Sequence, residues 1–77
     1  MTNFPNIFDE AKAESYSAVE SAAHLAAQYF AEAAYSATQA KSAVGAEAER
    51  LNRDVESKLR LAKSCVACAD ICVGKLR

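Results

Sequence analysis

The chain has 77 residues, of which 52% are hydrophobic and 25% charged, and its formal net charge is −1. A chain of this length forms at most one small domain, and folding buries only about 60% of the surface that the unfolded chain exposes. With a pI near 5.7, the chain has no overall charge that attracts nucleic acid or an anionic membrane. No apolar run approaches the roughly 18 residues of a membrane span, so we expect neither a nucleic-acid partner nor a membrane span.

The first residues lack the basic region and the apolar core of a secretory signal. The three cysteines are odd in number and close together in sequence, which argues against a disulfide framework. We therefore predict a cytoplasmic location with reduced thiols.

Residues 1–6 form a predicted lead, and residues 7–44 are predicted to be helical because they contain no Pro or Gly and are rich in Ala and Glu. A capping-box pattern from Ser17 to Glu20 leaves open a break near residues 14–17, which would create a short N-terminal helix. Gly45 is typical of a helix C-cap, so we expect a turn at 45–46 and a second long helix over 47–75.

Apolar residues in the first helical stretch follow a three-four spacing, which places them on one stripe of a helix. The second stretch carries a similar stripe, and its basic character favours antiparallel pairing with the acidic first stretch. In such a hairpin the numbers of facing residues add up to about 90. The predicted seam comprises Tyr16, Val19, Ala23, Ala26, Phe30, Ala33, Ala37, Ala40 and Val44 on the first helix, and Ala48, Leu51, Val55, Ala62, Ala69 and Leu76 on the second, where Leu59, Val66 and Val73 widen it on one side.

The apolar surface is wider than the seam of two helices can cover. The segment 65–73 is apolar almost all round, and such a helix is normally buried. We therefore expect a homo-oligomer, of which the simplest form is a two-fold dimer that makes a four-helix bundle. A second interface is predicted at Leu25, Tyr29, Tyr35, Leu61 and Ile71.

Cys65, Cys68 and Cys72 share one helix face because they are three and four residues apart. Soft thiolate ligands bind Cu(I) or Zn, and His24 lies at a similar level in the predicted hairpin. The segment from Cys65 to Cys72 resembles the Cys-x-x-Cys-Ala-x-x-Cys runs of four-helix copper-storage bundles, although those bundles carry many more cysteines. The alternative, which we favour, is that the cysteines pack as small hydrophobic residues.

Arg50, Arg53 and Lys63 lie along the outer side of the second helix, where they are typical of a solvated surface or could hold a small phosphorylated ligand. There is no Gly-rich phosphate loop and no Ser, His and acid arrangement that a helical rod could bring together. We therefore predict an all-α, non-enzymatic protein without a cofactor: an alanine-rich antiparallel helical hairpin that forms an oligomeric coiled coil or bundle. Its predicted role is protein–protein interaction, as a small inhibitor, an assembly factor or a structural subunit.

Overall fold

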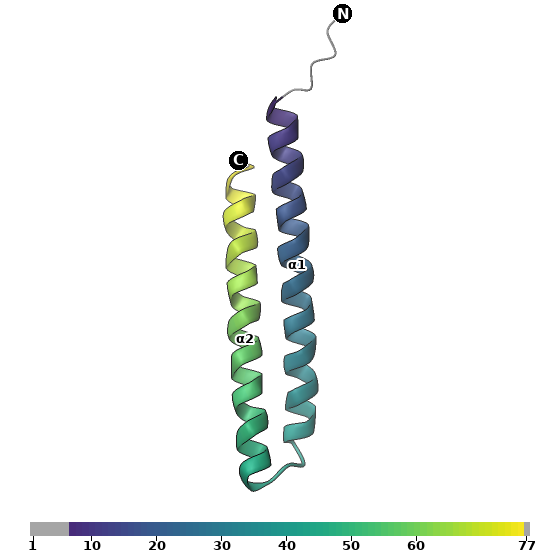
Figure 1. Cartoon of the computed structure of the whole chain (residues 1–77), viewed down its shortest axis with the longest axis vertical. Coiled ribbons are helices and arrows are strands. Elements are labelled where there is room, and N and C mark those ends of the chain that lie inside the picture. The colour runs from purple at the N-terminus through teal and green to yellow at the C-terminus, as the bar shows by residue number, and fades with distance from the viewer. Residues whose placement is uncertain (1–6, 77) are drawn as a thin grey trace, which may run out of the picture.

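Two long helices pack side by side as an antiparallel hairpin in the computed structural model of the chain (Figure 1). The structure describes the backbone of residues 7–76 and the side chains of residues 12–76. Helix α1 spans Ile7–Ala40 and helix α2 spans Gly45–Gly74. The predicted all-α hairpin is thus confirmed. Within the described residues, neither helix combines the length and the apolar character needed to cross a membrane.

Helix α1 is continuous, so the break considered near residues 14–17 is absent. Its sequence contains no Pro or Gly, and alanine, the best helix former, is frequent along it. The predicted lead at residues 1–6 lies outside the described residues.

The turn between the helices occupies residues 41–44 and therefore begins earlier than the predicted turn at 45–46. The amide of Ser42 bonds the carbonyl of Gln39 at 3.3 Å, and the amide of Ala43 bonds that of Ala40 at the same distance. These i to i−3 bonds tighten the chain at the end of α1.

Gly45 is the first residue of α2 rather than a cap on α1, and its φ is +63°. Residues other than glycine rarely adopt this left-handed conformation. A Cβ atom at Gly45 would meet nothing within 4 Å, so the position requires glycine for its backbone conformation and not for space.

A seam of small residues holds the hairpin together. The buried residues among 12–76 are Ala22, Ala26, Ala33, Ser36, Leu51 and Ala62. Half-buried residues continue the three-four spacing of the seam at Ser15, Val19, Tyr29 and Ala40 on α1, at Ala43 in the turn, at Ala48, Val55, Lys58, Cys65, Ala69 and Cys72 on α2, and at Leu76 just after it.

On α1, the seam differs from the predicted stripe at every second position. The two stripes share Val19, Ala26, Ala33 and Ala40. The other predicted residues are exposed, and the residue before each one lies in the seam instead; these exposed residues are Tyr16, Ala23, Phe30, Ala37 and Val44. On α2, Leu51 and Val55 lie in the seam and Leu59 is half-buried, whereas Val66 is exposed. The helices are therefore rotated so that Tyr29 and Ser36 face α2 and Phe30 does not.

Candidate interaction surfaces

The rotation of the helices leaves an apolar surface on one side of the hairpin, here called the apolar face. It comprises Tyr16, Ala23, Phe30 and Ala37 on α1, Val44 in the turn, and Leu59, Val66 and Val73 on α2, with Asn52 in line. Each of these residues directly follows a seam residue. Because the two helices are antiparallel, the residues that follow seam residues on α1 and those that follow seam residues on α2 lie on the same side of the hairpin.

The larger side chains of the apolar face are well exposed. The exposed fraction is 62% for Tyr16, 42% for Phe30, 83% for Val44 and 41% for Val66, while Leu59 and Val73 are half-buried. Singly exposed apolar residues are ordinary, but a contiguous apolar patch marks an interaction site. The apolar face is therefore a candidate contact surface for another helix.

The opposite side of the hairpin, here called the groove face, contains an open groove of about 460 Å³. The groove crosses from α1 to α2 near the middle of the hairpin. Its lining residues are Gln28, Ala31, Glu32, Tyr35, Ser36, Asp54 and Lys58. Five of these seven residues are polar or charged, in contrast to the apolar face.

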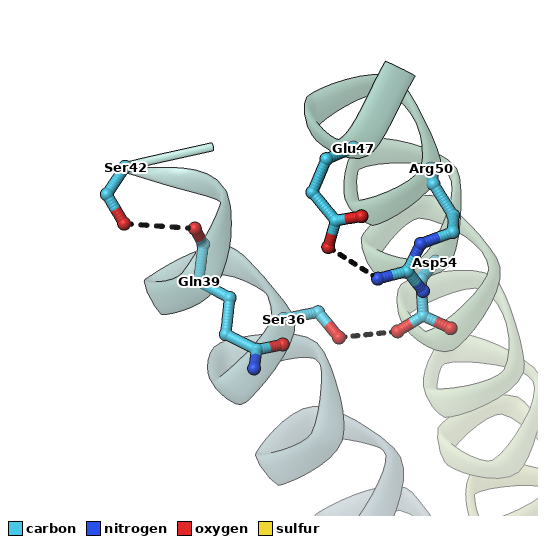
Figure 2. A network of polar contacts seen from close by, with 6 residues as sticks. All are labelled: Ser36, Gln39, Ser42, Glu47, Arg50 and Asp54. Carbon is cyan, nitrogen blue, oxygen red and sulfur yellow. Dashed lines mark hydrogen bonds and ion pairs between the residues drawn. The ribbon is translucent and has the colours of Figure 1, made fainter. Parts of the chain in front are cut away.

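Two polar pairs join the helices at the groove. The hydroxyl of Ser36 donates a 2.5 Å hydrogen bond to Oδ2 of Asp54 (Figure 2), and Nζ of Lys58 lies 3.1 Å from Oε1 of Glu32. The residue numbers of each pair add up to 90, as predicted for the hairpin. Sequence reasoning did not identify these pairs, although applying that rule to the polar residues would have found them.

Lys58 is the positively charged residue in the lining of the groove. Its ammonium lies 5.7 Å from the centroid of the Tyr29 ring, within the range of a cation–π contact. A hydrogen bond to Glu32 and the charge of that carboxylate raise the pKa of Lys58, with smaller contributions from Asp54 and Tyr29. The lysine therefore stays protonated at neutral pH.

A third polar pair lies within α2, near its N-terminus. Nη2 of Arg50 is 2.7 Å from Oε1 of Glu47 (Figure 2). The hydrogen bond from Arg50, together with its charge, lowers the pKa of Glu47. Figure 2 also shows the hydroxyl of Ser42 bonding the carbonyl oxygen of Gln39, 3.5 Å away, at the end of α1.

The predicted second interface divides between the seam and the surface. The structure places Tyr29 half-buried in the seam, where its ring faces Lys58. Leu25, Tyr35, Leu61 and Ile71 are exposed, with exposed fractions of 46%, 67%, 44% and 64%. Tyr35 lines the groove, and helical spacing places Leu25 and Leu61 on the groove face as well.

The residues of the metal hypothesis occupy different environments. Cys65 and Cys72 are half-buried in the seam, Cys68 is exposed, and all three thiols are free. His24 is exposed, with Nε2 4.0 Å from Oε1 of Glu20. Within the part of the chain that the structure describes, no three His, Cys, Asp or Glu side chains gather as a metal site would require.

The cations of the phosphate hypothesis are also spread out. Lys63 and Arg60 line a shallow depression of about 310 Å³ with Glu56 and Leu59, but Arg50 and Arg53 do not border it. No protein-family model, curated protein or solved structure matches the chain.

Proposed function

We propose that the chain is a non-enzymatic helical module that associates with itself and presents helix surfaces to a protein partner. Such a module can act as a small inhibitor, an assembly factor or a structural subunit. The observation that carries the proposal is the apolar face, on which Tyr16, Phe30, Val44 and Val66 are exposed along one side of the hairpin.

The thin core supports self-association. Among the buried residues of 12–76, Leu51 has the largest side chain, and the others are alanines and one serine. Each buried alanine methyl contributes only about 0.8 kcal/mol of hydrophobic stabilisation, so a single hairpin gains little from its seam. Covering the exposed aromatic and aliphatic side chains with another helix pair adds the apolar burial that the seam lacks.

The groove face supports a second contact, with a different protein. Tyr35 is 67% exposed beside charged groups, and tyrosines next to polar groups are common interface anchors. The three free thiols are in keeping with the reducing cytoplasm predicted from the sequence.

Native mass spectrometry of the purified protein, with sedimentation equilibrium at micromolar concentration, tests the proposal. We expect a clean multiple of the chain mass. Phe30→Glu should convert it to monomer, because a carboxylate on the apolar face would be buried in the contact. Tyr35→Glu, on the groove face, is the matched control and should leave the subunit number unchanged.

Two outcomes would overturn the proposal. A monomer at every concentration tested would show that the chain does not associate with itself. Mass of Cu or Zn, or of a phosphorylated ligand, that is retained in the native state and lost on denaturation would instead favour the thiolate or anion site. Replacing Cys65, Cys68 and Cys72 with alanine would then abolish metal retention, and charge reversal at Arg50 and Arg53 would abolish anion binding.

A further inference from the structure

We propose that the occupant of the apolar face is a second copy of this chain, with its α1 antiparallel to the first α1 about a two-fold axis at Phe30. The inference rests on the proposed self-association and adds the face, the direction and the register of the contact. In a two-fold contact, residue i of one copy meets residue j of the other, and j meets i. The contacting stripe must therefore show the same order of residue types when it is read in either direction.

The exposed stripe of α1 has this property. Beside the apolar face runs its outer edge, which carries the exposed residues Glu20, Ala27 and Ala34 on α1 and Lys41 directly after its last residue. The amide of Lys41 still bonds the carbonyl of Ala37 at 3.2 Å, as it would in the helix. Together, the face and the edge follow the order Tyr16, Glu20, Ala23, Ala27, Phe30, Ala34, Ala37, Lys41, Val44. This order reads the same in both directions by residue character: apolar ends, opposite charges next to them, paired alanines, and an aromatic ring at the centre.

The central alanines allow the two α1 helices to approach closely. Ala23 pairs with Ala37 of the second copy, and Ala27 pairs with Ala34. Phe30 meets its own symmetry mate, and Tyr16 at either end lies level with the turn of the second copy, which contains Val44. The only charged groups in the stripe, Glu20 and Lys41, meet as opposite charges at the outer edge, where both side chains remain in contact with water.

Helix α2 is compatible with the same axis. Its outer edge carries the exposed residues Glu49, Glu56, Lys63 and Asp70. Pairing Glu56 with Lys63 of the second copy puts the axis between residues 59 and 60. The cross-helix pairs Ser36–Asp54 and Glu32–Lys58 place this level beside residues 30 and 31 of α1. The same axis brings Glu49 level with Asp70 of the second copy, so the outer-edge charges of α2 balance. The preference for this axis therefore comes from Glu20 and Lys41.

The other two-fold arrangement of face-to-face hairpins has less favourable charges. It would lay α1 on α2 of the second copy at equal height, so Glu20 would face Asp70 while Lys41 would face Glu49. One attractive and one repulsive contact would then cancel, and Glu56 and Lys63 would face alanines. The antiparallel arrangement gains two kinds of attractive pair, Glu20–Lys41 and Glu56–Lys63, against one repulsive pair, Glu49–Asp70.

Charge reversal at Glu20 should change the dimer dissociation constant in opposite directions in the two arrangements. In the antiparallel dimer, Glu20→Lys places lysines opposite each other twice, and we expect the dimer dissociation constant to rise roughly tenfold at low salt. Adding Lys41→Glu should restore it. In the other arrangement, the same single change creates a pair with Asp70 and tightens the dimer, which would overturn the inference.

Photo-crosslinking gives a second readout of direction. With p-benzoylphenylalanine in place of Tyr16, and with the two copies carrying different nitrogen isotopes, the crosslink should reach residues 41–44 of the other copy. A crosslink to residues 70–73 of the other copy would overturn the inference while leaving self-association intact. Absence of any dimer by sedimentation would instead overturn the proposed function itself.

Discussion

At the scale of residues, polar pairs determine which side of α1 faces α2. Ser36 is the one polar residue among the buried positions of 12–76, and Asp54 accepts its hydrogen bond. Lys58 is held between Glu32 and the Tyr29 ring. Rotating α1 toward the predicted stripe would move Ser36 and Tyr29 away from these partners and bring in Ala37 and Phe30. Alanine in place of Ser36 could not donate a hydrogen bond to Asp54.

Removing the acceptor of Ser36 should therefore destabilise the hairpin. We expect Asp54→Ala to lower the free energy of unfolding by about 1–2 kcal/mol, because the buried hydroxyl loses its partner. Ser36→Ala in the same chain should recover part of the loss, since both polar groups are then gone. Asp54→Asn keeps an acceptor and is the milder control. Urea unfolding followed by circular dichroism measures all four chains, and equal losses with and without Ser36 would contradict the role of this bond.

The Glu47–Arg50 pair predicts a small loss of stability in acid. Because Arg50 lowers the pKa of Glu47 in the folded chain, the pair stabilises the fold above the usual pKa of a glutamate. This stabilisation is lost as pH falls through the lowered pKa. The native chain should therefore be slightly more stable than Glu47→Gln at neutral pH, and the gap should close in acid. Thermal unfolding from pH 7 to pH 2 checks this, and a constant gap would contradict it.

At the scale of elements, the sequence predicted two helices and their pairing but not the rotation of α1. The absence of helix breakers from 7 to 44 and the single glycine at 45 were sufficient for the hairpin. The rotation could not be predicted from apolar spacing because the competing stripes are nearly equivalent. Ala22 competes with Ala23, Tyr29 with Phe30, and both stripes share Ala26 and Ala33. Only the cross-helix pairs at the groove distinguish the stripes.

The two glycines of the hairpin should respond in opposite ways to alanine. Gly45→Ala should cost about 1–2 kcal/mol of unfolding free energy, because its φ of +63° is unfavourable for any residue with a Cβ atom. Gly74→Ala, at the end of α2, meets nothing within 4 Å and has no positive φ. It should be neutral or stabilise by up to about 1 kcal/mol. Denaturant unfolding of both variants tests this, and equal effects would contradict the assigned role of Gly45.

At the scale of the whole molecule, the packing of the seam accounts for the exposed apolar face. The seam buries small residues, which lets the helices lie close together, and leaves Tyr16, Phe30, Val44 and Val66 outside it. The sequence predicted this surplus of apolar surface and hence an oligomer. Which residues would form the candidate contact surface could not be predicted, since that depends on the rotation of α1.

If a second copy covers the apolar face, the stability of the fold must depend on protein concentration. Association that favours only the folded chain adds about 1.4 kcal/mol of apparent stability for each tenfold rise in concentration above the dissociation constant, counted per dimer. We expect the midpoint of thermal unfolding to rise with concentration from about 1 to 100 μM. Phe30→Glu should show a lower midpoint that does not change with concentration, because the lost contact is the source of the dependence. Tyr35→Glu should behave like the native chain. A midpoint independent of concentration in the native chain, measured together with a monomeric mass, would mean that the seam alone stabilises the hairpin.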